Sequence, residues 1–399
     1  MRKTVFAFIL ICGLALLCPP QALANVTVTA ATGGTNISAD KAQNASAPAF
    51  TTLGNIVISE NANGDFALGT GITLILTAPA GWRFNSPGSV TTTVSASGTP
   101  DVVVNSVTVT ASTITLNLTV IDNKRGDTLT IIGVQVQAID GAALPSAGNI
   151  LRTSGNPGTA VIAGITNNVT SFGSLSQVVG AAKTLVVAGF PSPTTAGVTN
   201  TFTVTAKDQF SNIATGYVGT VHFTSSDGQA VLPGNTGLTN GTGAFSAALK
   251  IAGTQSITAT DTITSSITGT QPNIVVNAAV ATKLVFTTQP ANTTAGVTMA
   301  SVVVQIQDQF GNNVSNAGTN ISLTLNGGGT LSGTTTLTTD ATGKATFDDL
   351  SITQSGSGKS LKVALPVASV VSVVVPLNVP PPFKVSEMFV PALETLFPN

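Results

Sequence analysis

Residues 195–212 read TAGVTNTFTVTAKDQFSN, and residues 294–312 read TAGVTMASVVVQIQDQFGN. The matches stay in order while the offset grows from 99 to 100 positions, which indicates an internal duplication with small changes in loop length. Apolar and hydroxylated residues alternate from Thr201 to Ala206, and Val302 to Gln307 is rich in β-branched residues. Both patterns predict strands with one buried face.

Turns separate these strands from the next ones. Each copy continues with Asp-Gln-Phe-x-Asn, and Asp and Asn side chains favour turns because they bond to nearby backbone groups. Further strands are predicted at Val218–Thr224 and Ile321–Leu325, and glycine-rich breaks follow them. Six or seven short strands in about 95 residues predict an antiparallel sandwich of immunoglobulin type. Without a cysteine pair or a core tryptophan, the repeats are not of the antibody variety.

The composition supports an all-β chain along its whole length. Of 399 residues only 8% are charged, 40 are glycine, and glutamate occurs three times. A helical protein of this size needs many more Glu, Lys and Arg residues. Acid–base chemistry draws on the same scarce groups, so we predict that the chain is not an enzyme.

The N-terminus has the pattern of a secretory signal peptide. Arg2 and Lys3 precede an apolar run from Val5 to Leu17, and Ala22-Leu23-Ala24 forms a small-residue cleavage site. We predict cleavage after Ala24, and therefore a secreted or cell-surface protein. The apolar run is too short to cross a bilayer, so the mature chain has no predicted transmembrane segment.

Export removes both cysteines, Cys12 and Cys18, so the mature chain forms no disulfide and no thiolate metal site. It keeps 13 basic and 16 acidic residues without a basic cluster, which makes nucleic acid a poor partner. The expected partner is an extracellular protein or glycan surface.

The region before the repeats predicts a larger sandwich. Asp101 to Val120 alternates on both sides of Ala111-Ser112, as in a hairpin, and Thr128 to Ala138 is expected to be one further strand. Ile72 to Leu76 leads into a turn that delivers Trp82, the only tryptophan. A parallel β-helix is the alternative, but it needs a short fixed period that this region lacks.

These patterns divide the chain into five parts. They are a signal peptide (1–24), an N-terminal β-sandwich (25–178), a first repeat (181–278), a second repeat (280–379) and a proline-led tail (380–399). The tail is either a sorting segment or the start of a truncated domain. No Pro/Ser-rich linker separates the sandwiches, so we predict tandem antiparallel immunoglobulin-like β-sandwiches arranged end to end.

Residues 195–227, which run from Thr-Ala-Gly-Val-Thr through Lys-Asp-Gln-Phe-Ser-Asn to Asp227, resemble the bacterial Ig-like repeats of surface proteins such as invasin-like and intimin-like adhesins. Residues 252–261 resemble the closing strand of those repeats. The resemblance covers about residues 181–379, and the N-terminal region resembles envelope-protein sandwiches only faintly. Such modules serve as stalks, spacers and binding domains, so the resemblance implies the module and not one function. Together with the predicted export, it implies a protein that is secreted or lies at the bacterial cell surface or outer envelope.

Few side chains could carry chemistry. His222 is the only imidazole and is expected to face solvent in its strand, opposite to its apolar neighbours. Gly356 to Ser360 imitates the end of a phosphate-binding loop, but the earlier glycine of that motif is replaced by Thr353. We predict no catalytic residue, no cofactor and no metal site.

Two weaker hypotheses concern ligands. Calcium takes roughly six to eight oxygen ligands, and Glu60, Asn61, Asn63 and Asp65 offer oxygens in one turn, although turn chemistry alone accounts for these residues. Sugar-binding sandwiches present an aromatic platform, for which Trp82 is the candidate.

The predicted function is structural or adhesive, as a multi-module stalk or spacer outside the cell. The first alternative is carbohydrate binding by the N-terminal sandwich. The second is a non-catalytic part of a larger exported enzyme.

Overall fold

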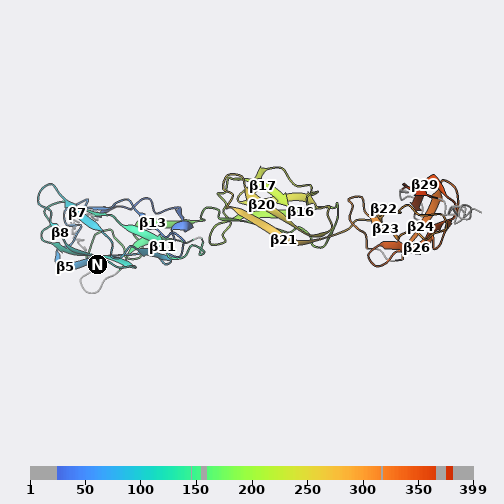
Figure 1. The fold of residues 1–399 in the computed structure, drawn as a ribbon. Helices are drawn as coiled ribbons and strands as arrows, with labels where there is room; N and C mark the ends of the chain where they lie inside the picture. Colours follow the sequence, from blue (N-terminus) through green and yellow to red (C-terminus); the bar gives the residue numbers. More distant parts are fainter. Residues whose placement is uncertain (1–24, 145, 154–159, 316–317, 365–373, 381–399) are drawn as a thin grey trace, which may run out of the picture. The chain divides into compact units, whose positions relative to one another are not determined.

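The computed structural model describes residues 25–144, 146–153, 160–315, 318–364 and 374–380. The predicted signal peptide and almost all of the predicted tail lie outside the described residues. The chain divides into two compact units, and Figure 1 labels many of their strands. One contains the N-terminal region up to residue 182 together with residues 207–216, and the other contains residues 183–206 and everything from residue 217 onward.

The N-terminal region is a sandwich, as predicted, and its strands pair antiparallel apart from the parallel pair Ile37–Ser38 and Ser171–Val178. One layer has the strand order β1-β4-β10-β7 with a three-stranded sheet β3-β11-β6, and the other has the order β2-β13-β12-β5-β9-β8. The strands are β1 (Thr27–Thr29), β2 (Ile37–Ser38), β3 (Thr51–Thr52), β4 (Ile56–Ser59), β5 (Gly69–Thr77), β6 (Trp82–Phe84), β7 (Thr91–Ser95), β8 (Val102–Val109), β9 (Thr113–Val120), β10 (Thr128–Ile132), β11 (Gln135–Ala138), β12 (Ala147–Thr153) and β13 (Ser171–Val178). A single 3-10 turn, η1 (Ala39–Lys41), interrupts the described strands here.

The predicted hairpin is present as β8 and β9, which pair directly around Ala111-Ser112. The single strand predicted from Thr128 to Ala138 is wrong. The chain turns at Gly133, whose φ is +79°, so β10 pairs with β4 and β7 while β11 pairs with β3 and β6. Alternation on both sides of the glycine concealed this change of sheet.

The core of this region lies between the layers. Fully buried residues alternate along β9 and β10, so that one face of each strand enters the core and the other faces outward. Phe66, Phe84 and Phe172 are among the largest buried side chains. Their burial stabilises the sandwich because each ring removes a large apolar area from water.

The first repeat forms two sheets with the orders β14-β16-β19 and β15-β21-β20-β17-β18. Its strands are β14 (Thr184–Ala188), β15 (Thr194–Thr195), β16 (Thr199–Lys207), β17 (Thr220–Ser225), β18 (Thr236–Gly237), β19 (Thr242–Ala248), β20 (Gly253–Asp261) and β21 (Thr268–Asn277). Four phenylalanines pack between the sheets, and the Phe202 and Phe223 rings meet edge to face with their centroids 5.7 Å apart. Such pairs add to the stabilisation from buried area.

The second repeat has the sheets β22-β23-β27 and β26-β24-β29-β30, with a short pair β25-β28. Its strands are β22 (Lys283–Thr288), β23 (Val302–Gln307), β24 (Asn320–Asn326), β25 (Leu331–Ser332), β26 (Thr336–Thr338), β27 (Lys344–Phe347), β28 (Ser351–Ile352), β29 (Gly356–Ala364) and β30 (Val374–Val379). The order matches that of the first repeat, since β16 corresponds to β23, β17 to β24 and β20 to β29. The predicted all-β immunoglobulin-like sandwich is therefore confirmed for both repeats.

Candidate functional site

The repeated Asp-Gln-Phe-x-Asn segment folds into the same loop in both copies. The Asp208 backbone N–H donates to the Asn212 carbonyl at 3.0 Å, and the Asp308 N–H donates to the Asn312 carbonyl at 3.0 Å. In each loop one carboxylate oxygen accepts the backbone N–H of Phe and of Asn, all at 2.9 Å. The Asn amide donates to the second oxygen, at 3.0 Å in the first loop and 2.8 Å in the second. The aspartate therefore organises the loop from inside.

The same aspartate also fixes the segment that precedes each repeat. Asp208 accepts the Gly180 N–H and Asp308 accepts the Ala279 N–H, both at 2.9 Å. Both carboxylates are buried, with 3% and 0% of their surface exposed. Burial alone would raise the pKa of Asp308, but the bonds from Asn312 and the backbone N–H groups hold that pKa below its ordinary value.

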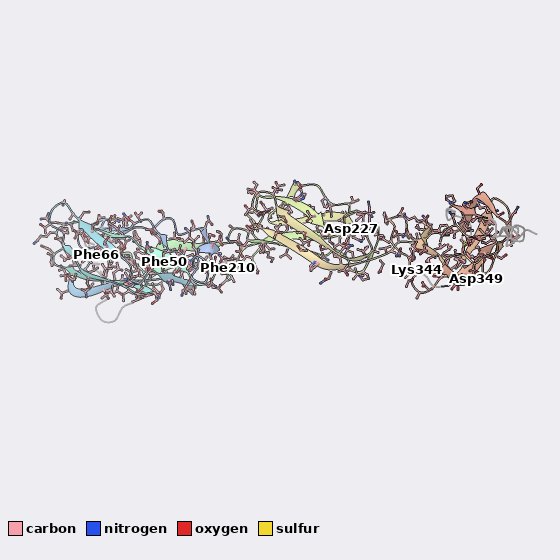
Figure 2. All side chains as sticks on the ribbon, in the orientation of Figure 1. Phe50, Phe66, Phe210, Asp227, Lys344 and Asp349 are labelled. Carbon is pink, nitrogen blue, oxygen red and sulfur yellow. The ribbon has the colours of Figure 1, made fainter. Side chains whose placement is uncertain are left out.

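The first loop lies against the N-terminal region, with which it shares one compact unit. Phe210, labelled in Figure 2, is half-buried and packs on the core of that region. The ring lies so close to Gly141 that a β-carbon there would be 2.1 Å from it. The Asn212 amide donates to the Gly141 carbonyl at 3.1 Å. Gly141 therefore contacts the Phe210 ring, and its carbonyl accepts the Asn212 amide.

We call the residues that a loop packs against its seat. Gln209 makes further polar contacts with the seat of the first loop. Its amide donates to the Asp40 carboxylate at 2.9 Å, and its carbonyl accepts the Ser46 N–H at 2.8 Å. Asp40 also accepts the Ala181 N–H at 2.8 Å. These bonds join residues more than 130 positions apart in sequence.

The second loop lies against the end of the first repeat, within the other compact unit. The Asn312 amide is bonded on both sides, since it donates to the Lys250 carbonyl at 2.7 Å and accepts the Ala252 N–H at 2.8 Å. The Phe310 ring covers Gly197, where a β-carbon would lie 2.4 Å from the ring. The Lys250 ammonium lies 5.9 Å from the centre of that ring, in the range of a cation–π contact.

The seat of the second loop is held from within the first repeat. Asp227, labelled in Figure 2, accepts the backbone N–H groups of Lys250 and Ile251. Its carboxylate is buried with 3% exposed. The backbone that receives Asn312 is therefore fixed by other bonds. This arrangement can attach one part of a polypeptide to another.

The four calcium candidates lie in one turn, but their carboxylates bond to backbone N–H groups. Glu60 accepts the N–H groups of Phe66 at 2.8 Å and Asp127 at 2.7 Å, and Asp65 accepts those of Asn61 and Ala62. The Asn63 amide donates to a carbonyl. Within the residues that the structure describes, no three His, Cys, Asp or Glu side chains group in a way that could hold a metal ion.

The turn is part of an acidic network that the sequence analysis did not recognise. Asp127 accepts the N–H groups of Asp101 and Val102, and Asp101 in turn accepts those of Lys124 and Arg125. Burial, and then the neighbouring Asp127 and Asp65 charges, raise the pKa of Glu60 despite its two backbone bonds. Burial likewise raises the pKa of Asp127. The network lacked a sequence signal because its members are separated by up to 67 residues.

The three remaining candidates, Trp82, His222 and Lys359, all lie in strands. Trp82 is buried with 3% exposed, so its ring offers no platform on which a sugar could stack. His222 faces solvent, as predicted, and its Nδ1 lies 2.8 Å from the Asn235 side-chain oxygen. Lys359 of the phosphate-loop imitation is buried in β29, and its ammonium donates to the carbonyls of Gly327 and Gly328 at 3.2 and 2.6 Å. A lysine bonded in this way is not free to bind a phosphate.

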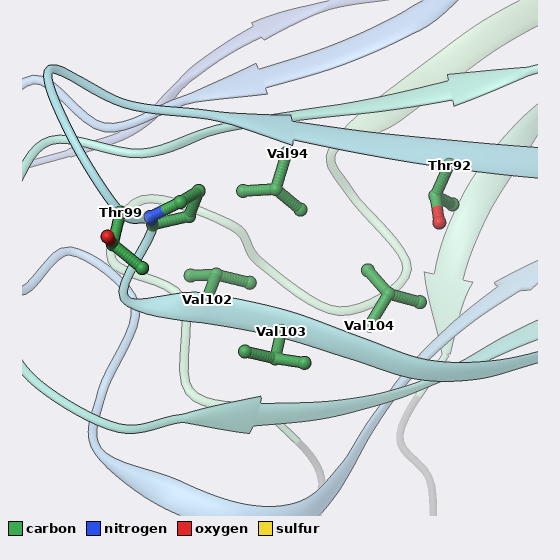
Figure 3. A pocket seen from close by; sticks show the side chains of 7 residues that line it. Thr92, Val94, Thr99, Val102, Val103 and Val104 are labelled. Carbon is green, nitrogen blue, oxygen red and sulfur yellow. The ribbon is translucent and has the colours of Figure 1, made fainter.

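One open pocket of about 310 Å³ lies between β7 and β8, which are the outermost strands of their sheets. Figure 3 shows Val94 facing Val102 and Val104 across it. It is lined by Thr92, Val94, Thr99, Pro100, Val102, Val103 and Val104. The lining has no titratable group, so the pocket offers apolar and hydroxyl contacts only.

No known protein family and no curated protein sequence matches this chain. Several solved structures match it at low sequence identity. The Escherichia coli adhesin FdeC matches with a TM-score of 0.30 and 14% identity, over 90% of this chain and 97% of that one. InvD of Yersinia pseudotuberculosis matches with 0.30 and 13%, over 90% and 99%. The D00-D0 domain of intimin matches with 0.28 and 12%, over 49% and 96%.

The solved structures that the chain resembles thus include bacterial adhesin and intimin modules, the group that the sequence resemblance named. Similarity at this level supports no conclusion about what this chain binds. Among the described residues, no helix is long and apolar enough to cross a membrane.

Proposed function

We propose that the chain is a secreted or cell-surface structural protein of a bacterial envelope, in which successive β-sandwiches act as a stalk or spacer. The observation that carries this proposal is the Asp-Gln-Phe-x-Asn loop. It occurs twice, and each time its aspartate holds the preceding linker while its Phe and Asn side chains bind a glycine-containing seat. A loop of this kind restrains the segment between two sandwiches, which is what a spacer requires.

The scarcity of reactive groups supports the same proposal. The only histidine is exposed and bonded to an amide, and the candidate lysine is bonded to carbonyls. An adhesive role on an extracellular protein or glycan surface is compatible with this reading, with the contacts made by loops and strand edges. Neither spacing nor binding requires a catalytic group, so the bonds made by these side chains are compatible with both roles.

The location is tested by fractionating cells that make the full chain and by treating intact cells with protease. We expect the protein outside the cytoplasm and open to the protease, with a mature N-terminus at Asn25. Recovery of the full-length chain from the cytoplasm would contradict the proposal.

The restraint is tested by limited proteolysis of the mature chain. Asp208→Ala and Asp308→Ala are expected to speed cleavage in residues 178–183 and 277–283 respectively, because the linker N–H groups lose their acceptor. Asp340→Ala is the matched control, since Asp340 accepts the N–H groups of Thr342 and Lys344 in a similar turn but holds no linker. Equal cleavage in all three variants would show that the loops do not restrain the linkers.

A further inference from the structure

The two repeats present equivalent groups at the end away from their own Asp-Gln-Phe-x-Asn loops. The Gly197 N–H donates to the Leu249 carbonyl at 2.7 Å, and the Gly296 N–H donates to the Ile352 carbonyl at 2.8 Å. Residues 250–252 of the first repeat, which receive Asn312, therefore correspond to residues 353–355 of the second. β20 and β29 then begin at Gly253 and Gly356, both with positive φ.

The seat of the first repeat is filled, and its counterpart in the second repeat is open. A β-carbon on Gly197 would meet the Phe310 ring at 2.4 Å, whereas a β-carbon on Gly296 would have no atom of the described residues within 4 Å. Gly296 is exposed. Among the described residues, no group bonds to the Thr353 carbonyl or the Ser355 N–H, which correspond to the two groups that hold Asn312.

The open seat is also shaped in advance. Thr353 donates its N–H to the Thr330 carbonyl at 3.2 Å, and its hydroxyl accepts the Thr330 N–H at 3.1 Å. These bonds fix the backbone at Thr353, as the bond from its N–H group to Asp227 fixes the backbone at Lys250. The backbone φ of Gly296 is +78°, against +83° for Gly197, so both glycines lie in the left-handed region and leave room for a ring.

We propose that this open seat, formed by Gly296 and residues 353–355, is a docking surface for a β-sandwich module of a separate chain that carries an Asp-Gln-Phe-x-Asn loop. The incoming Phe ring covers Gly296. The incoming Asn amide donates to the Thr353 carbonyl and accepts the Ser355 N–H, as Asn312 does at the filled seat. The proposal extends the proposed spacer function from contacts within one chain to contacts between chains.

The proline residues that follow the second repeat indicate that the incoming loop belongs to a separate chain. The Ala196 N–H donates to the Asn277 carbonyl, and the Ala295 N–H donates to the Pro380 carbonyl, so Asn277 corresponds to Pro380. Ala279, whose N–H reaches Asp308, then corresponds to Pro382, which has no N–H. A module that followed on this chain would leave its loop aspartate without that bond. A module of another chain brings its own linker N–H.

The seat differs from the filled one in a way that sets the strength of docking. Thr353 replaces Lys250, so position 353 of the open seat provides no ammonium for the incoming ring. Docking therefore depends on the ring and on the two amide bonds, and it is expected to be weak and reversible. Contacts of this kind become effective where many chains are displayed together on one surface.

Disulfide trapping suits a weak contact, because the mature chain is free of cysteine. The protein is the mature full chain with Gln354→Cys, and the probe is a head-to-tail cyclic peptide containing Lys-Asp-Gln-Phe-Gly-Asn and one cysteine. Two control peptides carry Ala in place of Phe or of Asn. At a fixed thiol concentration we expect about fivefold to tenfold more labelling by the loop peptide than by either control, as two hydrogen bonds or a buried ring would give.

Gly296→Ala in the same protein is expected to remove this advantage, because its methyl group takes the place of the ring. Gly318→Ala is the matched control, with a φ of +79° and equally open surroundings elsewhere in the repeat. Equal labelling by all three peptides, or an advantage that survives Gly296→Ala, would overturn the proposal. An advantage seen only after truncation at Pro380 would also overturn it, by assigning the seat to residues 381–399. These results leave the proteolysis of the Asp208→Ala and Asp308→Ala chains unaffected, so the two proposals fail separately.

Discussion

The two Asp-Gln-Phe-x-Asn loops have the same internal bonds and different surroundings. In the first loop, Gln209 bonds to Asp40 and Ser46, and the Asn212 amide makes one bond to the Gly141 carbonyl. In the second loop, Gln309 is exposed, while Asn312 makes two backbone bonds. The loop is therefore a self-contained unit. What it needs from its seat is a glycine beneath the ring and a carbonyl beside the amide, and the remaining contacts vary.

The largest effect is expected from removing the aspartate that both loops share. Asp308→Ala leaves the N–H groups of Ala279, Phe310 and Asn312 without their acceptor in a buried site. We expect it to lower the free energy of unfolding by about 3 kcal/mol. The loss is measured by urea denaturation of the mature chain, from the unfolding transition of the unit that contains the second repeat.

Asp308→Asn sharpens this result because its amide oxygen can still accept part of the N–H set. It should cost about half as much as Asp308→Ala. Asp208→Ala should destabilise the unit that contains the N-terminal region and the first loop. If both alanine variants changed only one and the same transition, the assignment of each loop to its own seat would be wrong.

The second prediction compares the filled seat with the open one. Gly197→Ala and Gly296→Ala both place a β-carbon at a positive φ, so both carry a similar backbone cost of about 1 kcal/mol. Only Gly197→Ala also displaces the Phe310 ring, which adds about 1 to 3 kcal/mol. The difference between the two variants in urea denaturation reports the seated ring.

Equal costs for Gly197→Ala and Gly296→Ala would mean that the ring leaves its seat freely. Combining Gly197→Ala with Phe310→Ala controls for this. The two substitutions should be less than additive, because removing the ring removes the clash.

The loop shows how far sequence alone could reach. Periodicity and turn chemistry located the strand before Asp208 and the turn after it, because both depend on neighbouring residues. The direction of Phe210 could not be predicted in this way. Its partner Gly141 lies about 70 residues earlier, and nothing in the spacing of either residue connects them.

Long-range packing limited the other expectations for the same reason. Glu60 and Asp65 were correctly placed in one turn, but Asp101 and Asp127 join them only through the fold. Trp82 follows a turn, a position equally typical of an exposed platform and of a strand that enters the core. Its burial depends on the sheets that close over it.

The third prediction is that pH affects the stability of the two units in opposite directions, through Glu60 in one unit and Asp308 in the other. Glu60 has a pKa raised above 4.5, so the folded state binds its proton more readily than the unfolded state does. Lowering the pH from 7 towards 4.5 should therefore stabilise the N-terminal unit. Asp308 has a pKa lowered below 3.8, so its contribution persists at pH 5 and is lost as the pH falls below about 3.8.

Calorimetry at pH 7, 5 and 3 is expected to show these opposite trends in two transitions. Glu60→Gln should remove much of the gain between pH 7 and 5, while Asp308→Asn should flatten the loss below pH 4. A gain between pH 7 and 5 that Glu60→Gln left unchanged would assign the effect to another group, of which Asp127 is the first candidate.

The smallest expected effect concerns the contact between the Lys250 ammonium and the Phe310 ring, for which the first loop has no counterpart among the described residues. Lys250→Met keeps an unbranched apolar stem and removes the ammonium above the Phe310 ring. A cation–π contact at a half-exposed site is worth about 0.5 to 1 kcal/mol, so the unfolding free energy should fall by that amount. In a chain that also carries Phe310→Leu, the same substitution should have no effect. A loss that persists without the ring would show that Lys250 acts through its stem, and both loops would then depend on glycine and carbonyl alone.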